Sequence, residues 1–159
     1  MKKNGPDRKT KTFIYKGLGI PVKLVNVPMK KAVGVWCIDI NMNKLMRIVL
    51  EAIIHKPTAL TGDEFKYIRK YLEMTMAEFG KEFGVSHVAV LKWESEQNKV
   101  SPPLELCIRL YVLNYLSAKD KEFRAFYREL SLQQLSESPK GKIHPLCVDA
   151  TTEDLKIAL

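Results

Sequence analysis

The sequence predicts a mainly α-helical protein, in which a small antiparallel β unit and a linking helix precede a five-helix helix-turn-helix domain. Residues 74–94 have the pattern of two short helices joined by a glycine turn. Apolar residues also recur at helical spacing in four further stretches, residues 41–55, 61–72, 102–117 and 120–130. β-Branched and aromatic residues gather within residues 12–38, which is typical of short strands.

Residues 1–40 are predicted to form a basic tail and a small β-rich unit. Strands are expected within residues 12–38, and Lys16-Gly17-Leu18-Gly19 reads as the turn between the first two. Because two or three strands alone are marginally stable in water, this unit must pack against something else. Residues 41–58 are predicted to be the linking helix, which ends before Pro57.

Residues 59–118 carry the signals of the helix-turn-helix domain. Two capping boxes, Thr61 with Glu64 and Thr75 with Glu78, predict the starts of two helices, which end near residues 72 and 83. A polar loop follows the motif, and Ser101-Pro102 predicts the start of a helix that extends to residue 117.

The motif itself has a glycine corner between its two helices. Gly84 suits a left-handed helix end, and Ser86 caps a second helix over residues 87–96. Four apolar side chains of the motif are predicted to be core: Phe79, Phe83, Val90 and Trp93. A second helix of this kind is shaped to enter the DNA major groove.

Residues 119–159 are predicted to be a C-terminal helix and an irregular tail. The helix is expected over residues 120–130. After Ser131 the periodic signal fades, and residues 152–159 read as one short amphipathic turn.

The positive charge is confined to the N-terminal part of the chain. The net charge is +8, and residues 1–31 hold nine basic residues against Asp7 alone, so the remainder is neutral. The N-terminal lysines are therefore expected to supply much of any salt-dependent attraction to nucleic acid. A solubilising tail or attraction to a membrane surface is the alternative interpretation.

Several classes of function are disfavoured by the residues. Cys37, Cys107 and Cys147 are odd in number and widely spaced, which favours free thiols in a reducing cytoplasm over a disulfide framework. No apolar run approaches the ~20 residues that span a bilayer, and no signal peptide is expected. No spacing suggests a catalytic set or a phosphate-binding loop. We therefore expect a cytoplasmic protein that is not an enzyme and needs no metal or cofactor.

The segment from Leu60 to Leu116 resembles the Xre-type helix-turn-helix family, which includes the lambda repressor and Cro-like proteins. Three stretches carry the likeness: Met74-Thr75, Phe83-Gly84-Val85-Ser86, and Val90-Leu91-Lys92-Trp93-Glu94. The resemblance implies a lambda-repressor-like fold and DNA binding. In many relatives a glutamine that hydrogen-bonds the DNA backbone stands where this chain has Met76.

A narrower resemblance is to MqsA-type antitoxins and related regulators. It rests on Tyr15-Lys16-Gly17, Ile20-Pro21-Val22, Asn26-Val27-Pro28, residues 41–55, and Leu60-Thr61-Gly62-Asp63-Glu64-Phe65. The N-terminal units of these proteins hold zinc with two CxxC pairs, whereas Cys37 is the only nearby thiol here. The resemblance therefore implies a zinc-less unit whose strands are held by packing, and a toxin protein as a candidate partner.

The residues expected to contact DNA lie around the second motif helix. Lys92 can donate to guanine, Val88 can pack on a thymine methyl with Leu91 beside it, and His87 can reach a base or phosphate. Phosphate contacts are expected near the helix caps and in the following loop. The complete set is Thr75, Ser86, His87, Val88, Leu91, Lys92, Asn98 and Lys99. Solvated surface side chains are the competing interpretation.

The function expected from these features is that of a sequence-specific transcriptional repressor that binds double-stranded DNA as a homodimer. Two recognition helices would enter successive major grooves ~34 Å apart. Residues 102–130 are the first candidate for the dimer interface and the N-terminal strands the second. The MqsA-type likeness suggests an autoregulating antitoxin of a type II toxin-antitoxin system. Two rival functions are a protein-binding adaptor that uses Val88 and Leu91, and a non-specific binder of RNA or membrane surfaces.

Overall fold

The structure, a computed structural model of the 159-residue chain, describes residues 8–116, 145–151 and 155–157. It divides into two compact units. We call residues 8–49, 145–151 and 155–157 the sheet unit, and residues 50–116 the helical unit. Helix α1 (Met42–His55) begins in the first unit and ends in the second.

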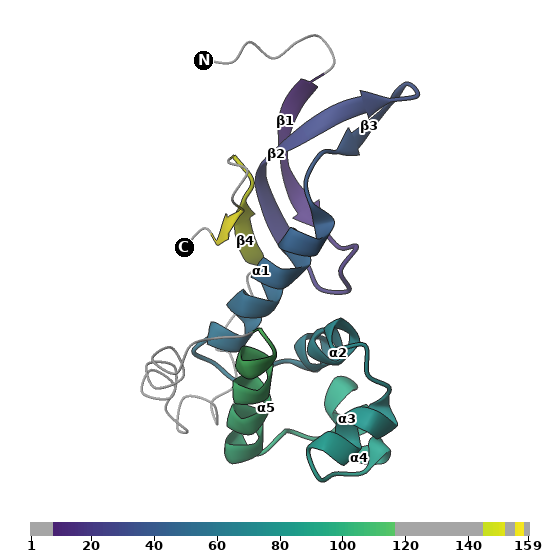
Figure 1. The fold of residues 1–159 in the computed structure, drawn as a ribbon, viewed down its shortest axis with the longest axis vertical. Helices are drawn as coiled ribbons and strands as arrows, with labels where there is room; N and C mark the ends of the chain where they lie inside the picture. The colour runs from purple at the N-terminus through teal and green to yellow at the C-terminus, as the bar shows by residue number, and fades with distance from the viewer. Residues whose placement is uncertain (1–7, 117–144, 152–154, 158–159) are drawn as a thin grey trace. The chain divides into compact units, whose positions relative to one another are not determined.

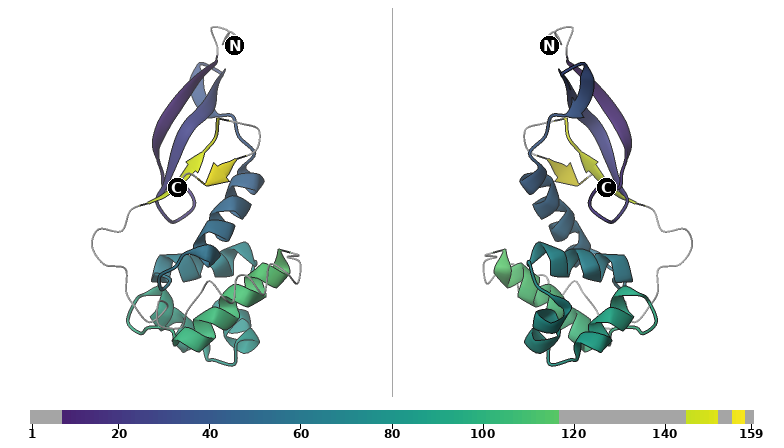
Figure 2. Two further views of the ribbon diagram at one scale, coloured as in Figure 1. Left: turned by 90° about the vertical axis from the view of Figure 1, so that its left-hand side faces the viewer. Right: turned by 90° about the vertical axis from the view of Figure 1, so that its right-hand side faces the viewer.

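The sheet unit is built around one long central strand, β2 (Val22–Ala32) (Figure 1). Strand β1 (Arg8–Tyr15) pairs antiparallel with it along one side. The other side is shared, because β3 (Val35–Ile38) pairs antiparallel with the end of β2 and β4 (Leu146–Asp149) pairs parallel with its beginning. The two-residue strand β5 (Lys156–Ile157) pairs antiparallel with β4, beside it in Figure 2.

A bulge in β2 explains the imperfect alternation of its apolar residues. Thr12 on β1 lies opposite both Val25 and Asn26, and the Asn26 backbone N–H donates to the Thr12 hydroxyl at 3.1 Å. Asn26 has a φ of 53°, which an asparagine tolerates better than most residues. The bulge shifts the alternation by one residue, so Val22, Leu24 and Val27 are all buried.

The prediction of a mainly α-helical fold is wrong, because the described residues form a five-stranded mixed sheet as well as helices. The antiparallel strands β1, β2 and β3 were expected, but β4 and β5 lie in the segment predicted to be an irregular tail. Val148 of β4 is fully buried, so this segment completes the core of the sheet unit. The helix predicted over residues 120–130 lies outside the described residues.

The helical unit contains α2 (Gly62–Tyr71), α3 (Met76–Glu82), α4 (His87–Glu94) and α5 (Pro102–Tyr115). These bounds agree with the predicted helices to within about two residues, which is the usual uncertainty of a helix end. Both predicted capping boxes are present, at Thr61 with Glu64 and at Thr75 with Glu78. Ser101 precedes α5 as predicted, but its side chain makes no capping hydrogen bond.

Three of the four apolar residues predicted to be core in the motif are buried: Phe79, Val90 and Trp93. Phe83 is only half-buried. The centre of its ring lies 4.8 Å from the centre of the Phe79 ring and 5.3 Å from the centre of the Tyr111 ring. Phe83 therefore packs at the edge of the core between α3 and α5.

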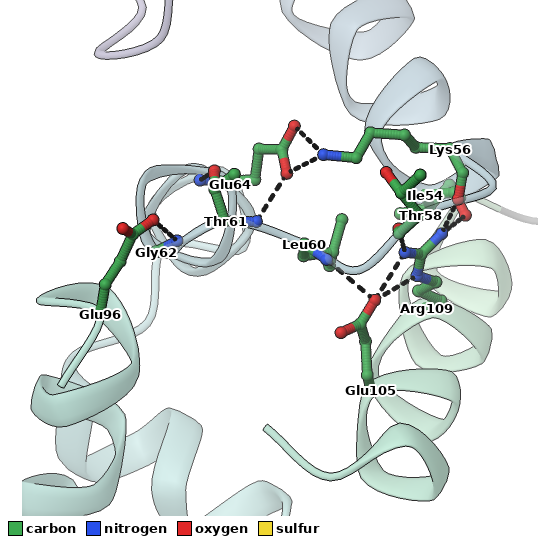
Figure 3. Close-up of polar contacts among 10 residues, drawn as sticks. All are labelled: Ile54, Lys56, Thr58, Leu60, Thr61, Gly62, Glu64, Glu96, Glu105 and Arg109. Carbon is green, nitrogen blue, oxygen red and sulfur yellow. Dashed lines mark hydrogen bonds and ion pairs between the residues drawn. The ribbon is translucent and has the colours of Figure 1, made fainter. Parts of the chain in front are cut away.

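A buried polar network joins α5 to the last turn of α1 and to the segment between α1 and α2 (Figure 3). The Arg109 guanidinium is fully buried and donates to the carbonyls of Ile54, Lys56 and Thr58, and to Glu105 at 2.6 Å. The same Glu105 oxygen accepts the backbone N–H of Leu60. Each buried charge is thereby paired and hydrogen-bonded, which is the condition for keeping charges inside a protein.

Candidate nucleic-acid interface

The recognition-helix candidate α4 is fixed at its C-terminal end by an ion pair with α2. Arg69 Nε donates to Glu94 Oε1 at 2.6 Å, its second nitrogen donates to Oε2 at 3.0 Å, and its third donates to the Met74 carbonyl. The Arg69 and Glu94 side chains are only 11% and 5% exposed. The hydrogen bond from Arg69 to Glu94 raises the pKa of the guanidinium above its ordinary value. Glu94 is therefore a buried carboxylate that is paired with a buried cation.

A close approach of α2 adds to this anchor. Gly62 begins α2 so near to α4 that an added Cβ would lie 2.5 Å from the Glu94 carbonyl oxygen. Its backbone N–H donates to the Glu96 carboxylate at 3.1 Å. Only a residue without a side chain fits here, so Gly62 sets the spacing between the two helices.

The corner between α3 and α4 is compact because Gly80 lies inside it. A Cβ at Gly80 would lie 2.6 Å from the Val85 carbonyl oxygen. Gly84 has a φ of 69°, as predicted for the residue that ends the first motif helix. The Ser86 hydroxyl then accepts the Ala89 N–H at 3.1 Å and caps α4.

These contacts fix the core-facing side of α4, and its opposite side is exposed to solvent. Val90 and Trp93 point into the core, being 1% and 7% exposed, whereas Val88 and Leu91 are 43% and 49% exposed. His87 and Lys92 are exposed as well. The sequence-predicted side chains His87, Val88, Leu91 and Lys92 therefore share the solvent face of one short helix.

Four further predicted residues surround this face. Thr75 and Ser86 are exposed helix caps whose hydroxyl oxygens accept backbone N–H groups, so each hydroxyl hydrogen remains available as a donor. Asn98 and Lys99 are exposed in the loop after α4, and the Asn98 backbone N–H donates to the Lys92 carbonyl. This loop therefore continues directly from the end of α4.

A carboxylate lies beside Thr75. Glu78 accepts the Thr75 N–H at 2.7 Å and closes the capping box. Hydrogen bonds from Thr75 hold the pKa of the Glu78 carboxyl below its ordinary value, so it is charged at neutral pH. The start of α3 therefore presents a negative charge and suits a phosphate less well than the start of α4.

The charge of the protein is distributed unevenly between the two units. Residues 50–116 hold eight basic and nine acidic side chains. The described part of the sheet unit holds ten basic residues against Asp39 and Asp149. Electrostatic attraction to a polyanion must therefore come mostly from the sheet unit. The exposed face of α4 can contribute mainly short-range hydrogen bonds and apolar contacts.

The described residues contain no group of three or more histidine, cysteine, aspartate or glutamate side chains that could hold a metal ion. Within the same residues, no helix is both long and apolar enough to span a bilayer. Comparison of the chain with family models, with curated proteins and with solved structures found no match.

Proposed function

We propose that the protein is a cytoplasmic, sequence-specific DNA-binding repressor in which α4 reads the major groove. The observation that carries this proposal is the exposed face of α4, where donors and apolar groups lie side by side on a helix whose rear is rigidly anchored. A preorganised helix loses little conformational entropy when it binds, which favours specific recognition.

The chemistry of this face matches base edges. Lys92 donates to the O6 and N7 acceptors of guanine, and the methyl groups of Val88 and Leu91 suit the thymine methyl. His87 lies in the first turn of α4, next to Ser86 and to backbone N–H groups that favour a phosphate. Asn98 and Lys99, in the loop after α4, are further candidates for phosphate contacts. Thr75, which caps α3, is another candidate.

The repressor would act as a homodimer on a palindromic operator, with the two α4 helices ~34 Å apart. The resemblance to MqsA-type proteins supports a role as an autoregulating type II antitoxin with a toxin protein as partner. Unlike the DNA contact, this finer role rests on analogy of sequence motifs alone.

The direct test is selection of binding sites from randomised DNA by the full chain. The unmodified protein should enrich one palindromic site. Lys92→Ala should relax the preference at one base pair in each half-site and cost about 1–3 kcal/mol of binding free energy. Lys66→Ala is the matched control, because Lys66 is an exposed lysine on α2 of the same unit. A site profile that is identical for Lys92→Ala and the unmodified protein would contradict major-groove reading by Lys92.

A second function is favoured by the same exposed apolar pair. Val88 and Leu91 lie one turn apart, and exposed apolar side chains in pairs commonly mark a protein contact. In an adaptor, Leu91→Gln would leave any DNA affinity unchanged and abolish binding of the partner. In a repressor, Leu91→Gln changes the selected DNA site.

A further inference from the structure

One face of the sheet unit changes from apolar to basic along the length of β2. In an antiparallel pair, residues directly opposite each other point to the same face. Lys9 and Lys11 on β1 lie opposite Met29 and Val27, and Lys31 on β2 lies opposite Trp36 on β3. The face that buries Val27 therefore continues towards the β2–β3 hairpin as three exposed lysines.

These lysines are not neutralised within the described residues. Lys9 Nζ lies 4.0 Å from the centre of the Trp36 ring, and Lys11 Nζ lies 5.8 Å from the centre of the Phe13 ring. The aromatic rings hold the ammonium groups in place without cancelling their charge. The neighbouring Lys30 points to the opposite face, where it pairs with Asp39 at 3.0 Å.

The hairpin that ends this face has an unusual tip. Val33 and Gly34 have φ angles of 50° and 79°, as in a two-residue hairpin turn that asparagine and glycine normally fill. A valine is strained at a positive φ. Val33 is also fully exposed, with a relative accessibility of 103%, and Val35 beside it is 64% exposed. The strain is therefore not offset by any packing of the Val33 side chain within the unit.

We propose that Lys9, Lys11, Lys31 and the tip residue Val33 form a second DNA-binding surface, which we call the β arm. The lysines bind backbone phosphates of duplex DNA without sequence choice, and Val33 makes an apolar contact in a groove, as apolar side chains of groove-binding arms do. The β arm rests on the proposed function, since it supplies the phosphate attraction that the helical unit, with eight basic and nine acidic side chains, lacks.

Duplex DNA fits the β arm better than other polyanionic partners. A single strand would be held by stacking on exposed aromatic rings, whereas Trp36 is half-buried and Lys9 covers its ring. A membrane surface would be held by a broad apolar face among the lysines. The exposed large apolar side chains of the sheet unit are instead two at the hairpin, Val33 and Val35, and two apart from it, Ile14 and Ile157.

The test compares two triple variants of the full chain that lose the same charge. The arm variant is Lys9→Ala with Lys11→Ala and Lys31→Ala. The control is Lys66→Ala with Lys70→Ala and Lys156→Ala, which removes exposed lysines elsewhere. Affinity for a labelled duplex of mixed sequence is measured as a function of salt. The arm variant should flatten the slope of log K against log salt by about 2–3, since each phosphate contact contributes about 0.9. The control should change it by less than about 1.

Equal slopes for the two variants would overturn the β arm, as would a larger loss of affinity for single-stranded RNA or anionic vesicles than for the duplex. Acetylation of the unmodified protein provides a measurement that needs no variant. The duplex should protect Lys9, Lys11 and Lys31 but not Lys66 or Lys156, and equal protection of all five contradicts the proposal.

The tip is tested by Val33→Gly. Glycine relieves the positive φ, so the melting temperature should rise or stay constant, while the affinity for the duplex falls about three- to tenfold through the lost apolar contact. An unchanged affinity would exclude the groove contact. If the arm variant keeps the full salt slope while Lys92→Ala still alters site selection, the β arm fails and the repressor proposal stands. The opposite pattern leaves the β arm as a DNA contact and removes the repressor proposal.

Discussion

The ion pair between Arg69 and Glu94 provides the sharpest test of how α4 is held. Arg69→Met removes two hydrogen bonds to Glu94 and one to the Met74 carbonyl, while it keeps most of the side-chain volume. The Glu94 carboxylate, 5% exposed, is then left without its charged partner. Breaking a buried pair from one side costs about 3–5 kcal/mol, because an uncompensated charge remains inside.

Replacing both partners should cost far less than replacing one. In Arg69→Met with Glu94→Leu no charge remains buried, and such double replacements are often neutral or stabilising. The double variant is therefore expected within about 1 kcal/mol of the unmodified protein. The difference between the single and double variants measures the desolvation cost of the Glu94 carboxylate rather than the strength of the pair.

The assay is urea unfolding followed by tryptophan fluorescence in a Trp36→Phe background, so that the signal comes from Trp93, whose buried ring has its centre 6.2 Å from that of Phe65. Lys70→Met is the control, because it removes an exposed charge from the same helix and should change stability by less than about 0.5 kcal/mol. Since Glu94 ends α4, sequence-specific DNA affinity should fall in the single variant and recover in the double. A cost below about 1 kcal/mol for Arg69→Met would refute the reasoning.

Three further variants test the corner and the cap of the motif. Gly80→Ala places a Cβ 2.6 Å from the Val85 carbonyl oxygen, so it should destabilise the protein by about 1–3 kcal/mol and weaken DNA binding. Gly84→Ala is the control, because a Cβ at Gly84 meets no atom within 4 Å. It should cost only the strain of a left-handed backbone conformation, about 1–2 kcal/mol. Equal losses of DNA binding in Gly80→Ala and Gly84→Ala would contradict a steric role for Gly80. Glu78→Gln tests pH dependence. Because the folded-state pKa of Glu78 lies below its unfolded value, its stabilising contribution is present at neutral pH and is lost as the pH falls through the folded pKa. The difference between unfolding midpoints of the unmodified protein and Glu78→Gln should therefore shrink on acidification, and a constant difference would argue against the capping hydrogen bonds.

The strands of the sheet unit are held by pairing with a segment that is distant in the sequence. Strand β4 pairs with the first four residues of β2, and the Asn26 side chain donates to the Thr151 hydroxyl at 3.1 Å. The Ala150 N–H also donates to the Val25 carbonyl. Contacts between segments more than a hundred residues apart therefore stabilise a unit whose N-terminal strands would be marginal alone.

The local features of the helical unit were predictable from the sequence. Capping boxes at Thr61 and Thr75, the left-handed Gly84 and the Ser86 cap all depend on residues within four positions of each other. The same holds for the alternation of buried and exposed positions on α4, which places Val90 and Trp93 inside and Val88 and Leu91 outside. Short-range hydrogen bonds and helical spacing suffice to set these features.

Only the tertiary structure decided the fold class, the partners of the buried charges and the clustering of the basic residues. The sequence around Val148 has no strand signal strong enough to identify a partner near Leu24, because strand pairing depends on non-local packing. Glu94 looks like any surface carboxylate until Arg69 is brought against it, and Lys9 has no neighbour in the sequence that predicts Trp36. Local interactions determine where helices begin and end, whereas the surroundings of a charge are determined by chain segments that meet only in the folded protein.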